Sequence, residues 1–189
     1  MPKLWRDTVE AHRNEVRDAI QDVTASLVET HGLRGVTMSQ IADEVGIGRA
    51  TLYKYYPDVD AILYAWHDRL VGRHLAELAS ARDAATDPAQ RLQAVLETFA
   101  DLSRRRGRHN RELAAFLHRD GRAARALKEL DDMLCDLIAE AAGAGAVRDD
   151  VPAGELASYC IHALGAAGAL RSPASARRLV AVTLAALEP

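Results

Sequence analysis

Apolar residues recur at helical spacing along nearly the whole chain, and no segment shows sustained alternation of apolar and polar positions. Alanine, a strong helix former, is abundant. The pattern therefore predicts an all-α protein. Glycine, proline and capping residues divide it into about nine helices, over residues 7–30, 37–45, 49–56, 58–82, 88–106, 108–118, 122–142, 152–170 and 173–187.

Two of these segments, 37–45 and 49–56, have the proportions of a helix-turn-helix. Thr37 is placed to cap the first helix, and Gly46 has the freedom to take a positive φ at the turn between them. An ordinary helical hairpin with aromatic packing is the alternative explanation of this pattern. The inward-facing positions of the pair are Ile41, Ala42, Val45, Ile47 and Leu52.

The second helix of the pair leaves an exposed face of unusual chemistry when Leu52 packs inward. No acid occurs between residues 47 and 56. Arginine can donate two hydrogen bonds to guanine, threonine can contact a base, and lysine or a tyrosine hydroxyl can hold phosphate. The pattern therefore indicates a surface for the major groove of DNA, built from Arg49, Ala50, Thr51, Tyr53, Lys54 and Tyr55.

The last two helices are apolar almost all the way round. A helix with two apolar faces needs two packing partners, so either a second subunit covers one face or the pair is fully buried inside a monomer. For the dimer, the interface residues that we expect are Leu156, Cys160, Ala163, Ala167, Leu170, Leu179, Val182 and Leu187.

Charge restricts how this protein can bind nucleic acid. The net charge of the 189 residues is −3, with 8 Lys and Arg against 11 Asp and Glu up to residue 70, and 16 against 16 beyond it. Bulk charge argues against a generic polyanion binder, so cations must be placed locally.

Cysteine content and hydropathy indicate the compartment. Only Cys135 and Cys160 occur, both within apolar helical patterns, which predicts small buried side chains and a reducing cytosol. No apolar run is long enough to span a membrane, and the first residues lack the apolar core of a secretory signal. We therefore expect a soluble cytoplasmic protein without a membrane partner.

The stretch "GVTMSQIADEVGIGRATLYKYYPDVDAIL" resembles the DNA-binding signature of the tetracycline-repressor (TetR) family. The family's pattern has a threonine at the start of the first short helix, Ile-Ala within it, Gly-Val-Ser at the turn, and then Thr-Leu-Tyr and an aromatic pair. The resemblance implies DNA contacts from Thr37 and Ser39 besides the exposed face already described, with Tyr53 as a phosphate anchor.

Three positions depart from that signature. Gly48 stands where serine is usual, Ala50 where glycine is common, and Val59 where a lysine contacts phosphate. Without that one phosphate contact, the slope of log binding constant against log salt concentration should be smaller in magnitude by about 0.9. Lys3 and Arg6 near the N-terminus are candidates to compensate for the missing lysine.

The resemblance also implies a C-terminal region that binds a small ligand and dimerises through its last two helices. Bulky or adaptable side chains are the candidates for ligand contact, although the same spacing also builds a core. The candidates are Trp66, Leu70, Phe99, Phe116, Met133, Leu137, Tyr159 and His162.

Other features have simpler explanations. The seven histidines include no pair four residues apart, so we expect no metal site, and no motif indicates a cofactor. The run "RRRGRHNR" at 104–111 is either an anion site or a solvated helix end.

These observations predict a homodimeric, ligand-responsive repressor with a DNA-binding domain at 1–57 and a ligand-binding and dimerisation domain at 58–189. Its two recognition helices would enter successive major grooves of a palindromic operator. The alternative is a helical protein-interaction module that does not bind DNA, and an α-helical enzyme is a third hypothesis.

Overall fold

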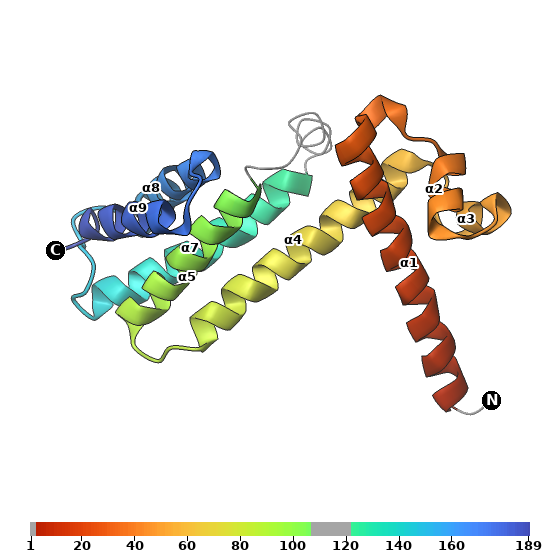
Figure 1. The fold of residues 1–189 in the computed structure, drawn as a ribbon. Helices are drawn as coiled ribbons and strands as arrows, with labels where there is room; N and C mark the ends of the chain where they lie inside the picture. Colours follow the sequence, from red (N-terminus) through yellow and green to blue (C-terminus); the bar gives the residue numbers. More distant parts are fainter. Residues whose placement is uncertain (1–2, 107–121) are drawn as a thin grey trace. The chain divides into compact units, whose positions relative to one another are not determined.

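The computed structural model describes residues 3–106 and 122–189, and within these ranges every regular element is helical, which confirms the all-α prediction (Figure 1). The helix expected at 108–118 lies outside the described residues. The elements are α1 (Lys3–His31), η1 (Leu33–Gly35), α2 (Met38–Val45), α3 (Arg49–Tyr55), α4 (Val59–Asp83), α5 (Pro88–Arg106), α7 (Arg122–Gly143), α8 (Ala153–Gly165), η2 (Ala166–Ala169) and α9 (Pro173–Ala185), where η marks a 3-10 helix.

The described chain forms two compact units that meet within α4, the first ending at Leu70 and the second beginning at Val71. Each unit has its own apolar core. The first unit extends past the domain boundary expected at residue 57, because Ile62, Leu63 and Trp66 of α4 are buried in its core.

The first unit packs α1, α2, α3 and the start of α4 around Ile20, Ile41, Leu52 and Ile62, all with no exposed surface. Each such side chain contributes about 1.5–3 kcal/mol by burial. Asp58 opens α4 by accepting a hydrogen bond from the backbone N–H of Ala61 at 2.8 Å, which satisfies one donor of the first turn.

An ion-pair group joins α1 to α4 inside this unit. The guanidinium of Arg69 lies 2.8 Å from the Asp18 carboxylate and also pairs with Asp22. The Arg69 side chain is 22% exposed, so solvent screens these pairs less than those of a fully exposed arginine.

Between Trp66 and Leu78, α4 has no buried residue. Gly72 lies in the middle of this stretch, and a Cβ added there would meet no atom within 4 Å. Glycine in a helix interior costs about 1 kcal/mol relative to alanine, so this is also the weakest part of the helix by intrinsic propensity.

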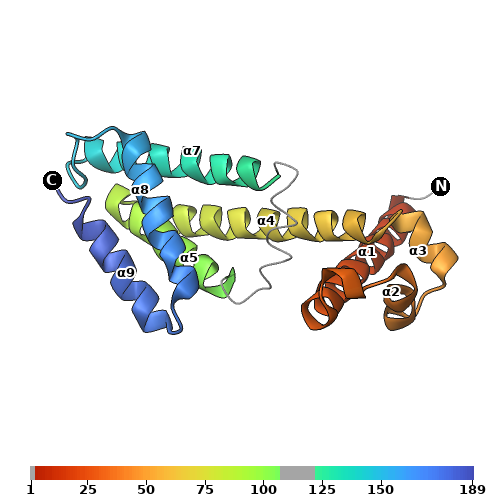
Figure 2. The ribbon, with the colours of Figure 1, turned by 90° about the horizontal axis from the view of Figure 1, so that it is seen from above.

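The second unit is organised around α5, which contacts α7, α8, η2 and α9 (Figure 2). Its core includes Leu92 and Leu96 of α5, Leu134 and Ile138 of α7, and Leu164 of α8. On the surface of this unit, Arg91 of α5 pairs with Glu140 of α7 at 2.6 Å.

The helix expected over residues 152–170 is interrupted. α8 ends at Gly165, and residues 166–169 continue as the 3-10 helix η2. Gly165 and Gly168 lower the α-helical propensity of this segment, and the N–H of Ala166 is shared between the carbonyls of Ala163 and Leu164. Periodicity alone did not indicate this change of helix type.

Within the described residues, no helix is both long enough and apolar enough to cross a bilayer.

We predict that Gly46→Ala destabilises the first unit by about 1–2 kcal/mol, because Gly46 has φ 76° and a left-handed alanine is strained. Gly48→Ala is the matched control. Gly48 has φ −66°, and its Cβ would lie 3.9 Å from the Thr51 hydroxyl oxygen. Alanine at position 48 lowers the entropy of the unfolded chain, which stabilises the protein, but it is a poorer helix cap, which destabilises it. The free energy of unfolding should therefore change by less than about 0.5 kcal/mol. Urea unfolding of both variants measures the difference, and equal destabilisation would contradict the role given to the turn.

Candidate nucleic-acid interface

The turn between α2 and α3 is held by backbone geometry that the sequence specifies. Thr37 begins α2 with a capping box: its hydroxyl accepts from the N–H of Gln40 at 3.3 Å, and the Gln40 amide oxygen accepts from the N–H of Thr37 at 2.9 Å. At the other end of α2, Gly46 is left-handed, and the N–H of Ile47 donates to the Ala42 carbonyl at 3.0 Å.

Burial of Leu52 fixes which side of α3 faces solvent. Leu52 has no exposed surface and packs in the first core, as expected. On the other side Tyr53 is 56% exposed, and Arg49, Ala50, Thr51 and Lys54 are also exposed. Within the first unit, α3 therefore presents cations and hydroxyl groups without a carboxylate between Arg49 and Tyr55.

The remaining predicted contacts are half-buried or lie on α2. Thr37 is exposed, whereas Ser39 and Tyr55 are of intermediate exposure. Tyr55 also packs against the first core, so its ring supports α3 as well as bordering the exposed face.

Ser39 and Arg49 join the two helices across this face. Nη1 of Arg49 donates to the Ser39 hydroxyl oxygen at 3.4 Å, a long hydrogen bond. This contact places the Arg49 guanidinium beside Ser39 at the start of α2. Both residues are predicted DNA contacts, but the sequence did not indicate the bond between them.

A buried polar pair supports the C-terminal end of α3. Nε2 of Gln21 in α1 donates to the Tyr56 hydroxyl oxygen at 2.7 Å, and the two residues are 6% and 9% exposed. Tyr56 follows α3 directly, and its N–H donates to the Leu52 carbonyl. Because a buried amide without a partner is costly, this bond favours one position of α3 relative to α1. No sequence signal indicated it, since Gln21 and Tyr56 are 35 residues apart.

The expected dimer residues separate into two groups. Leu156, Cys160, Ala167 and Leu187 are buried within their own subunit and cannot supply an exposed face. Ala163, Leu170 and Leu179 are half-buried, and Val182 is 65% exposed. Tyr159 of α8, expected at a ligand site, is 42% exposed.

The expected ligand-binding residues that the structure describes lie in both cores and on the surface. Trp66 is buried in the first core and Leu70 packs against it, whereas Phe99, Met133 and Leu137 belong to the second. His162 is exposed, with ring Nδ1 2.7 Å from the Ser158 carbonyl oxygen, and Phe116 lies outside the described residues.

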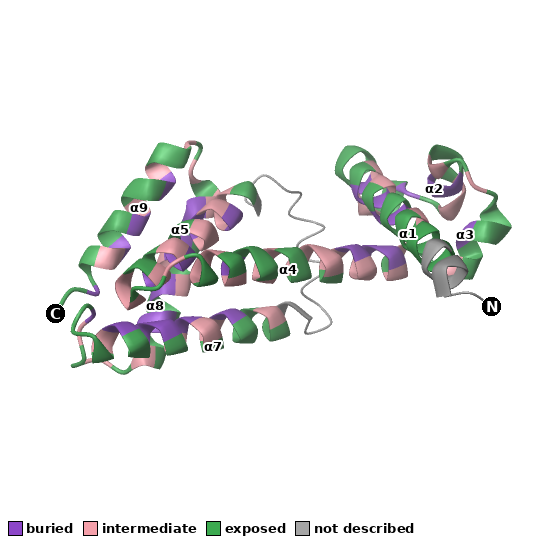
Figure 3. Ribbon diagram, turned by 90° about the horizontal axis from the view of Figure 1, so that it is seen from below, coloured by how far each residue is buried: buried purple, intermediate pink, exposed green. Residues whose placement is uncertain are grey.

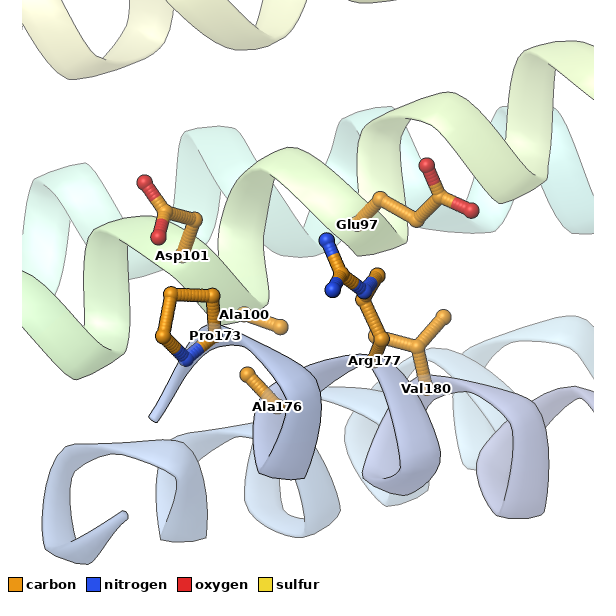
Figure 4. A pocket seen from close by; sticks show the side chains of 7 residues that line it. All are labelled: Glu97, Ala100, Asp101, Pro173, Ala176, Arg177 and Val180. Carbon is orange, nitrogen blue, oxygen red and sulfur yellow. The ribbon is translucent and has the colours of Figure 1, made fainter. Parts of the chain in front are cut away.

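A groove in the second unit is lined by residues other than the expected ligand-binding ones. It encloses about 160 Å³ between α5 and α9, and Arg177 points from α9 toward α5 beside Glu97 (Figure 4). Its other lining residues are Ala100, Asp101, Pro173, Ala176 and Val180. This volume is smaller than the roughly 300 Å³ or more that is typical of small-molecule sites.

Metal-binding chemistry is not visible in the part of the chain that the structure describes, where no three His, Cys, Asp or Glu side chains come together as ligands. Cys160 is fully buried, which raises the pKa of its thiol to about 11, and Cys135 is half-buried. Burial and the neighbouring carboxylate of Asp131 raise the pKa of the Cys135 thiol.

Comparison with known protein families shows which family the chain belongs to. Residues 20–65 match the family described as bacterial regulatory proteins of the tetR family. Residues 87–189, more than half of the chain, match the C-terminal domain described as transcriptional regulator SbtR-like. The chain belongs to the TetR family. Its helix-turn-helix lies inside the first matched segment, which ends within α4.

Individual relatives are distant. The nucleoid occlusion factor SlmA of Haemophilus influenzae is 25% identical to this TetR-family chain over 104 residues, covering 55% of the chain and 46% of that protein. The chain thus spans about half the length of this curated relative.

Solved structures share the fold over most of their length. A tetR-family regulatory protein from Rhodococcus RHA1 has a TM-score of 0.71 at 16% identity, covering 92% of this chain and 97% of that one. AibR, in complex with isovaleryl coenzyme A and operator DNA, has a TM-score of 0.67 at 19% identity, covering 92% and 98%.

We predict that the native protein exposes at most one reactive thiol at pH 8. With a pKa of about 11, roughly one Cys160 in a thousand is ionised at that pH, and its sulfur is buried. Titration with a chromogenic disulfide should give one slow thiol natively and two after unfolding. The Cys135→Ser variant should then show none, and rapid native labelling of that variant would contradict the prediction.

Proposed function

We propose that this protein is a ligand-responsive transcriptional repressor that binds a palindromic operator as a homodimer. One observation supports DNA binding above all: α3 buries Leu52 and presents Arg49, Thr51, Tyr53 and Lys54 to solvent with no acid among them. Side chains of these types recognise base edges and phosphates in the major groove.

Each exposed side chain of α3 has a role that its chemistry suits. Arg49, hydrogen-bonded to Ser39, is placed to donate two hydrogen bonds to a guanine. Thr51 contacts a base or a thymine methyl group. The Tyr53 hydroxyl and the Lys54 ammonium hold phosphates and set the register of the helix in the groove.

The dimer follows from the exposed apolar surface of α8, η2 and α9. Tyr159 and Val182 are exposed there beside the exposed small residues Ala166, Ala181 and Ala185. Small side chains let helices approach closely, and two exposed large apolar groups favour burial against a second copy. Two-fold symmetry would place the recognition helices about 34–36 Å apart on DNA.

Residues 1–57 act in this proposal as the DNA-binding domain and residues 58–189 as the ligand-binding and dimerisation domain. The structure of AibR with isovaleryl coenzyme A and operator DNA shows that a protein of this fold binds both classes of partner. A small molecule releases the operator only if it binds the DNA-incompatible conformation more tightly than the compatible one. A regulator of this kind needs no catalytic group and acts in the bacterial cytoplasm.

We expect Arg49→Ala to reduce the preference for operator over random duplex by about 1–3 kcal/mol, because it removes a hydrogen-bonding group that reads a base. Tyr53→Phe should weaken binding to both duplexes equally, because it removes a phosphate contact. Gel shifts with DNA upstream of the protein's own gene measure both effects. Arg125→Ala is the control, since its side chain is 86% exposed on α7 in the second unit. Equal preference in wild type and Arg49→Ala would refute base reading by this residue.

We expect Val182→Glu to weaken self-association at least about tenfold, because it places a charge on a surface that the dimer desolvates. Sedimentation velocity over a dilution series measures the dimer constant. Val9→Glu is a matched control, because Val9 is 54% exposed on α1. A wild-type protein that sediments as a monomer throughout would disprove the dimer.

A further inference from the structure

The N-terminal half of α1 extends outside the part of the chain that matches its family. α1 begins at Lys3, whereas the family match begins at residue 20. Ile20 is also the first buried residue of the helix in the described side chains, and between residues 9 and 19 every side chain except Val16 is exposed (Figure 3). This half of the helix therefore lies before the matched segment, and its described side chains are open to solvent except for Val16.

Two arginines lie next to each other on this surface. Arg13 and Arg17 are four residues apart, so their side chains are neighbours along one side of α1. Both are exposed, and no ion pair joins either of them to a side chain between residues 9 and 105. In the sequence, Arg6 precedes Arg13 by seven residues, close to two helical turns, and Lys3 precedes Arg6 by three.

Most carboxylates near these arginines are engaged by other groups. Glu15 lies 3.7 Å from His12, and Asp18 and Asp22 both pair with Arg69 of α4. At about 100° per residue, Arg17 is about 100° and Arg13 about 140° around the helix from Asp18, so these arginines face away from the ion pairs with α4. Glu10, three residues before Arg13, is the carboxylate that lies on the same side of α1 as the two arginines.

The first unit carries more acidic than basic residues, so exposed arginines without internal partners matter for its binding to DNA. Up to residue 70 the chain has 8 Lys and Arg against 11 Asp and Glu, and α4 begins with the uncharged Val59. An acidic unit approaching a polyanion is repelled unless cations without internal partners meet the phosphates. Arg13 and Arg17 belong to the same compact unit as α3, and α1 continues beyond α2 and α3 toward its N-terminus (Figure 1).

We propose that Arg13 and Arg17 of α1 form a second phosphate-binding surface, which contacts the backbone of the duplex flanking the bases read by α3. This inference rests on the proposed function, since it requires that the protein binds DNA. The contact is independent of sequence, because phosphates carry no base information.

The test needs neither the operator nor the small-molecule ligand. A fluorescent random-sequence duplex of about 30 base pairs is titrated with full-length protein at several salt concentrations. Removing one phosphate-binding cation flattens the plot of log binding constant against log salt by about 0.9, so a substitution in both subunits of a dimer should flatten it by about 1.8. We expect this change for Arg13→Gln and for Arg17→Gln.

Three variants separate a phosphate contact from a structural effect. Arg17→Lys keeps the charge and should restore most of the slope. Glu10→Gln removes the carboxylate beside the two arginines and should tighten binding, which damage to the fold would not do. Arg125→Gln, on the exposed surface of α7, should leave the slope unchanged. Thermal unfolding of each variant verifies that the fold persists.

The outcomes distinguish this inference from the proposed function. If Lys54→Gln flattens the slope while Arg13→Gln and Arg17→Gln do not, the α1 surface is refuted and the helix-turn-helix still binds DNA. If wild-type protein binds no duplex at low salt, both proposals fail. Flattening by both arginine variants with tighter binding by Glu10→Gln supports the second surface.

Discussion

The seating of Leu52 in the first core is the constraint on which the DNA-facing surface depends. With Leu52 fully buried, helical geometry places Arg49, Thr51 and Lys54 outside. The left-handed Gly46 sets the direction in which α3 leaves α2, and the bond between Gln21 and Tyr56 anchors its far end to α1. A helix of only seven residues is unstable in isolation, so α3 keeps its form through this packing rather than through its own propensity.

Much of the fold could be predicted from local sequence signals. Thr37, Gly46 and the proline at position 173 stand where the helices begin or turn, because capping and positive φ depend on one or two residues. The interruption at Gly165 was missed, since the choice between α and 3-10 geometry in an alanine-rich segment has a small energy difference and depends on packing. The short helix η1 was also missed, for a similar reason.

The candidate site shows the same division. Which side of α3 is exposed follows from periodicity, but the pairing of Arg49 with Ser39, and of Arg69 with Asp18, joins different helices and depends on tertiary structure. For α8 and α9, a pattern that is apolar on all sides could not show which residues their own subunit covers. Cys160 and Leu187 are buried there, whereas Val182 is open. For α4, the helical spacing of Trp66 indicated a buried position but not which unit would bury it, and the structure places it in the first core.

The stretch of α4 without buried residues has a mechanical consequence. Trp66 and Leu78 are anchored in different cores, and the twelve residues from one to the other span about 18 Å of helix rise. Arg69 and Leu70 still contact the first unit and Leu75 packs against the second core, with Gly72 between them. Among the described residues, positions 71–74 belong to neither apolar cluster, so a small bend there would change the direction of α4 without repacking either core.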